Sequence, residues 1–156
     1  MPLGRCVRFV AVLAGLGVAA CGGHTVTKQD VIARGNAICA GAVRDLRATP
    51  VPAAGETSLP GLATYLGAVT PILQREISNL RALPRPAEDR ALLDRYLAAV
   101  TKSGATYRAL EAAARRGDQD GVNQALAELQ ADPSSSLAAR YGLNQCAGGA
   151  GTAVAR

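Results

Sequence analysis

Apolar residues recur after position 28 mostly at steps of three and four positions, which is the spacing of one face of an α-helix. No stretch shows the two-residue alternation that is typical of a strand. Proline, glycine and serine separate the apolar stretches. The pattern therefore predicts four helices, at about 28–48, from near 58 to the turn at 83–86, at about 87–116, and from 118 to 142.

The predicted helices carry their own start and stop signals. Thr27 and Asp30 have the spacing of a capping box before the first helix. Pro71 predicts a kink in the second helix, and Pro133 predicts a break or kink in the fourth at 132–134. Four helices joined by short connections favour an all-α fold, an up-down four-helix bundle in which the first and last helices are neighbours.

The first 20 residues have the layout of a bacterial export signal. Arg5 and Arg8 form a basic start, and residues 9–20 are an uncharged apolar run. That run is shorter than the roughly 20 residues that a membrane-spanning helix needs. Residues 18–21 (VAAC) resemble the lipobox of bacterial lipoproteins, which implies that Cys21 is acylated and becomes the first residue of the mature chain. An ordinary signal peptide, cut near the same point, is the alternative.

A lipid anchor at Cys21 would divide the chain into four parts. Two acyl chains hold a protein stably at a bilayer, whereas one binds it only marginally. Residues 1–20 would be the cleaved signal, and 21–27 a lipidated tether at the outer face of the bacterial cytoplasmic membrane. Residues 28–146 would form the helical domain, and 147–156 a Gly-containing disordered tail.

The export signal accounts for two of the four cysteines. Cys6 leaves with the signal and Cys21 carries the lipid, so Cys39 and Cys146 remain in an oxidising compartment. We therefore predict a disulfide between Cys39 and Cys146. A free, nucleophilic Cys39 is the alternative. However, the only histidine is His24 in the tether, where it is a poor candidate for the base.

Charge and motif content argue against several classes of function. The formal net charge of +5 includes the two signal arginines, so the excess in the rest of the chain is too small to indicate nucleic-acid binding. Residues 118–129 begin like a calcium loop but lack its glycine and its final glutamate. A single histidine excludes a di-iron bundle, and no serine-hydrolase or phosphate-loop motif is present. We expect no cofactor, no metal and no enzymatic activity.

Three hydroxyl-bearing side chains share one face of the third predicted helix: Tyr96, Ser103 and Tyr107. Inside a bundle they could orient a small ligand. Packing of the rings in the core, with the hydroxyl groups satisfied at its edge, is the simpler interpretation. An open polar cavity would favour a small-ligand carrier or enzyme, and a closed Leu/Ala core would favour an interaction module.

The turn between the second and third predicted helices carries three arginines: Arg81, Arg85 and Arg90. In an up-down bundle this turn lies at the same end as the tether, so the arginines could face anionic lipid headgroups at about 1 kcal/mol each. The electrostatics of helix ends, with Glu88 and Asp89 nearby, is the simpler explanation.

Three segments carry a resemblance to a known group of proteins. They are residues 37–39 (AIC), 80–86 (LRALPRP) and 141–146 (YGLNQC), and together they look like small, uncharacterised lipoproteins and secreted proteins of actinobacteria. The resemblance implies a disulfide-tied helical bundle and supplies no catalytic residue. Our leading hypothesis is therefore a non-enzymatic envelope module that binds a protein, a lipid or a cell-wall component. The alternative is a small-ligand carrier or enzyme that uses a polar pocket in the bundle.

Overall fold

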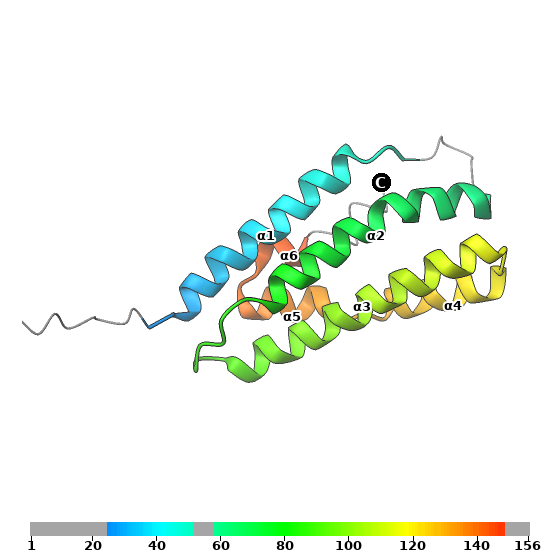
Figure 1. Cartoon of the computed structure of the whole chain (residues 1–156). Helices are drawn as coiled ribbons and strands as arrows, with labels where there is room; N and C mark the ends of the chain where they lie inside the picture. The colour runs from blue at the N-terminus through cyan, green and yellow to red at the C-terminus, as the bar shows by residue number, and fades with distance from the viewer. Residues whose placement is uncertain (1–24, 52–57, 149–156) are drawn as a thin grey trace, which may run out of the picture.

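The computed structural model describes residues 25–51 and 58–148, and this part of the chain is built from helices and their connections, without strands (Figure 1). The predicted all-α class is therefore confirmed for these residues. No helix among them is both long and apolar enough to cross a membrane. The signal, Cys21 and most of the predicted tail lie outside the described residues.

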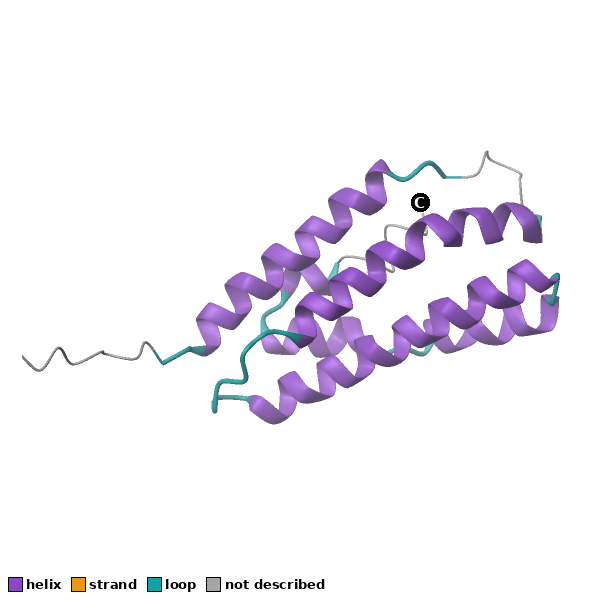
Figure 2. Cartoon of the chain, viewed as in Figure 1, coloured by secondary structure: helices purple, strands orange, loops and turns teal. Residues whose placement is uncertain are grey.

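Three long helices lie alongside one another: α1 (Lys28–Ala48), α2 (Leu59–Arg81) and α3 (Arg90–Arg116) (Figures 1 and 2). Helix α1 has the predicted bounds and the predicted capping box, in which the Asp30 amide donates to the Thr27 hydroxyl over 3.2 Å. Helix α2 begins after Ser58, whose hydroxyl accepts from the Gly61 amide at 3.2 Å. It continues through Pro71, so this proline does not end the helix.

Helix α3 starts three residues later than predicted. Asp89 precedes it in the left-handed region, with φ 52°, and so cannot belong to the helix itself. Its carboxylate pairs with Lys28 Nζ at 2.5 Å. The ion pair joins the turn between α2 and α3 to the first turn of α1, so both lie at one end of the domain (Figure 1).

The fourth predicted helix is divided into three pieces: α4 (Gln119–Gln130), α5 (Ser134–Tyr141) and α6 (Asn144–Ala147). The break between α4 and α5 falls at the predicted position, next to Pro133. Gly142 ends α5 with φ 101°, a conformation that side chains rarely tolerate. The chain then turns back, and α6 lies against α1 (Figure 1). Ala147, which was predicted to begin the disordered tail, is instead the last residue of α6.

The reversal into α6 brings distant cysteines together. The predicted disulfide between Cys39 and Cys146 is confirmed, with a Cα–Cα distance of 5.1 Å. Leu143 is fully buried and occupies the space that a side chain at position 35 would need, so Gly35 allows the close approach of this segment to α1.

The buried side chains form separate clusters toward the two ends of the bundle. One cluster surrounds Leu93, Tyr96 and Tyr141, close to the disulfide. Another surrounds Leu66 and Leu110, where α2, α3 and α4 meet. A cavity lies between these clusters and is lined by residues of both.

Candidate functional site

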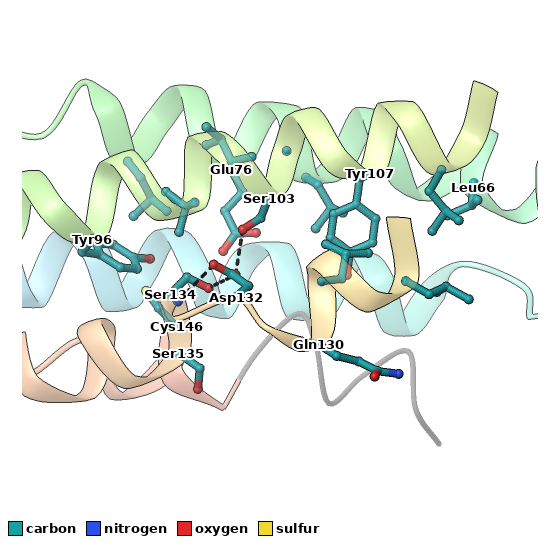
Figure 3. A pocket seen from close by; sticks show the side chains of 18 of the residues that line it. Leu66, Glu76, Tyr96, Ser103, Tyr107, Gln130, Asp132, Ser134, Ser135 and Cys146 are labelled. Carbon is teal, nitrogen blue, oxygen red and sulfur yellow. Dashed lines mark hydrogen bonds between the residues drawn. The ribbon is translucent and has the colours of Figure 1, made fainter. Parts of the chain in front are cut away.

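A cavity of about 510 Å³ opens between α2, α3 and the C-terminal helices (Figure 3). Ligand pockets in proteins have volumes of roughly 300 to 1,000 Å³. Most of its wall is apolar, and aliphatic side chains such as Leu73, Ile77 and Leu129 form a large part of it. Leu126 also lines it and is 41% exposed, so part of the apolar wall faces solvent. The volume and the open apolar wall are suited to a small, largely apolar ligand.

The structure brings the three predicted pocket residues together. Tyr96, Ser103 and Tyr107 all line this cavity from α3. Steps of seven and four residues place them on one helix face. Burial raises the pKa of both tyrosines, so their hydroxyl groups stay protonated at neutral pH and can donate as well as accept hydrogen bonds.

Asp132 faces Ser103 across the cavity and had not been singled out from the sequence. The Ser103 hydroxyl donates to Asp132 Oδ2 over 2.7 Å. The backbone amide of Ser134 donates to Asp132 Oδ1 over 3.2 Å, and the Ser134 hydroxyl also donates to this carboxylate. Asp132 therefore holds the start of α5 against α3, and its two oxygens already have three donors.

Glu76 is a second carboxylate that the sequence reasoning missed. It lines the cavity from α2, and Figure 3 shows its side chain directed toward Ser103 and Asp132. Within the described residues no hydrogen bond or ion pair reaches its carboxylate. Burial raises the pKa of Glu76 to about 7, because the charged form loses hydration without gaining a partner.

The sequence did contain a signal for Glu76. Val69, Leu73 and Leu80 are buried positions of α2, separated by steps of four and seven residues. Position 76 divides the step of seven into three and four, so it belongs to the same stripe of the helix. A glutamate at such a position is unusual, because carboxylates are rarely buried unless they are paired.

Tyr96 is a second polar residue of the cavity, after Glu76, whose side-chain polar group has no partner among the described residues. Its side chain is 2% exposed, and among the described residues no hydrogen bond to its hydroxyl is found. In Figure 3 the hydroxyl points into the cavity, toward Asp132. Among the described residues, the fully buried side-chain oxygens without a partner are Thr70 Oγ1 and Tyr141 Oη, so the Tyr96 hydroxyl is open to the cavity and available to a ligand.

The three predicted membrane-facing arginines differ in their contacts. Arg85 pairs with Asp94 over 3.1 Å and donates to the Arg81 carbonyl oxygen. Arg81 and Arg90 are exposed, and Arg90 donates to the Arg85 carbonyl oxygen at 3.4 Å. All three lie at the end of the domain where α1 begins, as the ion pair of Lys28 requires.

Cys146 and Ala147 complete one side of the cavity, so the disulfide also anchors part of its wall. Within the described ranges, no group of three or more His, Cys, Asp or Glu side chains could hold a metal ion. Cys21 and His24 fall outside these ranges.

Comparison with known proteins adds no functional information to this geometry. No protein-family model, curated protein or solved structure matches this chain. The resemblance to actinobacterial lipoproteins therefore stays a prediction, and the chemistry of the cavity follows from its own residues.

Proposed function

We propose that this chain is a non-enzymatic envelope module, held at the outer face of the cytoplasmic membrane by a lipid on Cys21, that binds a small, largely apolar ligand inside its helical bundle. The observation that carries the proposal is the cavity of about 510 Å³, with aliphatic walls and polar groups gathered at one end. Protein interiors normally leave few voids larger than a water molecule.

Among the hypotheses drawn from the sequence, the cavity favours a ligand carrier. A surface-binding module needs no interior space, and a closed core around Tyr96 and Tyr107 would have favoured it. Instead, both rings border the cavity. We infer an up-down bundle whose fourth arm is broken at 131–133, and this break places Asp132 at the cavity wall.

The arrangement of the polar groups supports binding better than catalysis. Ser103 and Ser134 direct their hydroxyl hydrogens toward Asp132, which orders the start of α5. Activation of a serine needs a neighbouring base that is oriented by a third group. The described cavity residues include carboxylates and hydroxyl groups but no imidazole.

A cavity-filling variant tests the proposal. The full-length chain carrying Cys21→Ser, which removes the proposed lipidation site, is titrated with the neutral apolar dye N-phenyl-1-naphthylamine. We expect saturable fluorescence enhancement at one site per chain. Val100 lines the cavity, so Val100→Phe should weaken dye binding at least about tenfold by occupying part of the space.

The matched control is Ala105→Phe, which adds a ring at an exposed position of the same helix. It should bind the dye like the parent chain. Thermal unfolding of both variants shows whether they remain folded. Absence of saturable binding in the parent, or equal binding by a folded Val100→Phe variant, would contradict the proposed function.

A further inference from the structure

We propose that the polar end of the cavity receives the ammonium group of an amphipathic amine, with Glu76 as its counter-ion and the Tyr96 hydroxyl as an acceptor. The inference rests on the proposed function and adds the chemical class of the ligand's head group. The apolar body of the amine would contact the aliphatic walls of α2, α3 and α4.

The sign of charge in the cavity favours a cation. Two carboxylates, Glu76 and Asp132, line it, whereas none of the described lining residues is Lys, Arg or His. A negative field in a site with low-dielectric walls attracts cations and repels anions. A fatty acid would bring a third carboxylate into this space with no basic side chain to receive it.

The two carboxylates differ in their partners. Asp132 accepts three hydrogen bonds from Ser103 and Ser134, which already satisfy it. Glu76 has neither a hydrogen bond nor an ion pair within the described part of the chain. A charge that is withdrawn from water is costly unless it is paired, so an ammonium group would supply what the protein itself does not.

Tyr96 supplies support that is independent of the acids. Its ring is packed in the core, its side chain is 2% exposed, and its hydroxyl has no partner among the described residues. Figure 3 shows that this hydroxyl and the carboxylate of Glu76 both face the polar end of the cavity. An ammonium group has three hydrogen-bond donors and could reach both oxygens.

The cavity should also discriminate between a charged ammonium head group and a neutral hydroxyl head group. An alcohol could donate one hydrogen bond to Glu76 but would leave its charge uncompensated. A primary amine is protonated at neutral pH, like the side chain of lysine. The structure therefore favours amines over alcohols of the same chain length, and alcohols over carboxylic acids.

The test compares three ligands that share one alkyl chain. Decylamine, decanol and decanoate are titrated at pH 8, below their micelle-forming concentrations, into the full-length Cys21→Ser chain, and each displaces N-phenyl-1-naphthylamine. We expect decylamine to bind at least about tenfold more tightly than decanol, because hydrogen bonds to charged groups are stronger than neutral ones. Decanoate should bind most weakly.

Two variants locate the effect in the cavity. Glu76→Gln, which keeps the shape of the side chain, should weaken decylamine binding about tenfold or more and change decanol binding less than about threefold. Tyr96→Phe, which removes only the hydroxyl, should weaken decylamine binding severalfold and tests the polar end of the cavity independently of Glu76. Glu88→Gln, an exposed site outside the cavity, is the control for a loss of one negative charge.

The outcomes separate the two proposals. If none of the three ligands displaces the dye and the dye itself does not bind, the proposed function is wrong. If the ligands bind but decanoate matches or exceeds decylamine, or if folded Glu76→Gln binds decylamine normally, the cavity stands and the amine inference is wrong. Both the proposed function and the amine inference would be supported if the parent chain prefers decylamine, Glu76→Gln abolishes this preference, and Glu88→Gln retains it.

Discussion

The backbone amide of Gln145 donates a hydrogen bond to the side-chain oxygen of Asn36 over 2.9 Å, across 109 positions of the chain. The amide nitrogen of the same Asn36 side chain donates to the Gly142 carbonyl oxygen at 3.4 Å. One side chain of α1 therefore contacts both ends of the reversal into α6. This explains how Cys146 reaches Cys39 near the middle of α1 rather than a residue at its start.

The contact between Gly35 and Leu143 predicts opposite effects for two similar substitutions. A methyl group at position 35 would collide with the buried Leu143 side chain, so Gly35→Ala should destabilise the protein by about 1 to 3 kcal/mol. Gly41 lies on the same helix with only Arg44 near its would-be Cβ, at 3.7 Å. Gly41→Ala should stabilise it by about 0.5 to 1 kcal/mol through helix propensity. Urea unfolding measures both, and equal effects would contradict the packing described.

Removal of the disulfide should lower stability substantially. The bond joins residues separated by 107 positions, and in the chain-entropy model a loop of that size contributes about 4 to 5 kcal/mol. Cys39→Ala with Cys146→Ala should therefore lower the free energy of unfolding in urea by several kcal/mol. Addition of a reductant should destabilise the parent by a similar amount and leave the double variant unchanged. A parent that is insensitive to reductant would contradict this prediction.

The elevated pKa of Glu76 predicts how stability changes with pH. The pKa of Glu76 is 4.5 in the unfolded chain, and burial raises it to about 7 in the folded protein. Between pH 4.5 and 7 the folded state therefore holds a proton on Glu76 that the unfolded state has lost. The contribution of Glu76 to stability is therefore fully present below pH 4.5, declines as the pH rises to 7, and is constant above that.

Glu76→Gln removes this dependence and isolates it from other groups. The variant should match the parent near pH 4 and exceed its unfolding free energy by about 1 to 3 kcal/mol at pH 8. The other ionisable groups near Glu76, including Asp132, Tyr96 and the Asp45–Arg75 ion pair on the neighbouring surface, are present in both proteins, so the difference between parent and variant isolates Glu76. A difference that stays the same from pH 4 to pH 8 would contradict the assignment.

Lipidation at Cys21 is tested by localisation. Cys21→Ser should release the chain from the membrane fraction, and mass spectrometry of the parent should find the added mass of acyl chains at residue 21. Cys6→Ser is the matched control, because this cysteine lies in the predicted signal and should not affect anchoring. If Cys21→Ser remains membrane-bound and uncleaved, an uncleaved anchor is the better account.

The arginines of the turn between α2 and α3 predict a modest effect on orientation. Arg81 and Arg90 are exposed at the end where α1 begins, whereas Arg85 is paired with Asp94. Alanine at 81 and 90 should therefore change the orientation of the anchored protein on anionic vesicles more than alanine at 85, since each free basic residue contributes about 1 kcal/mol. Neutron reflectometry on neutral and anionic bilayers measures this. If the protein has the same orientation on neutral and anionic bilayers, the arginines do not face the headgroups and are explained by the electrostatics of the helix ends.

Much of the fold could be predicted from the sequence because local signals decide it. Helical periodicity and capping residues predicted α1 with its observed bounds, and Pro133 predicted the break between α4 and α5. Counting the cysteines predicted the disulfide, since the proposed signal and lipid site left one pair. The periodicity of α3 also grouped Tyr96, Ser103 and Tyr107 on the face that lines the cavity.

The cavity and its polar end were decided by tertiary structure. Periodicity indicates which face of a helix is buried, but whether facing side chains meet or leave a space depends on their combined volumes and on the separation of the helices. Position 76 lies between the buried Leu73 and Leu80 of α2, but the sequence reasoning did not single it out. Only the packing of α2, α3, α4 and α5 shows that the Glu76 carboxylate shares a cavity with Asp132 and Tyr96, without a basic side chain among the described residues that line it.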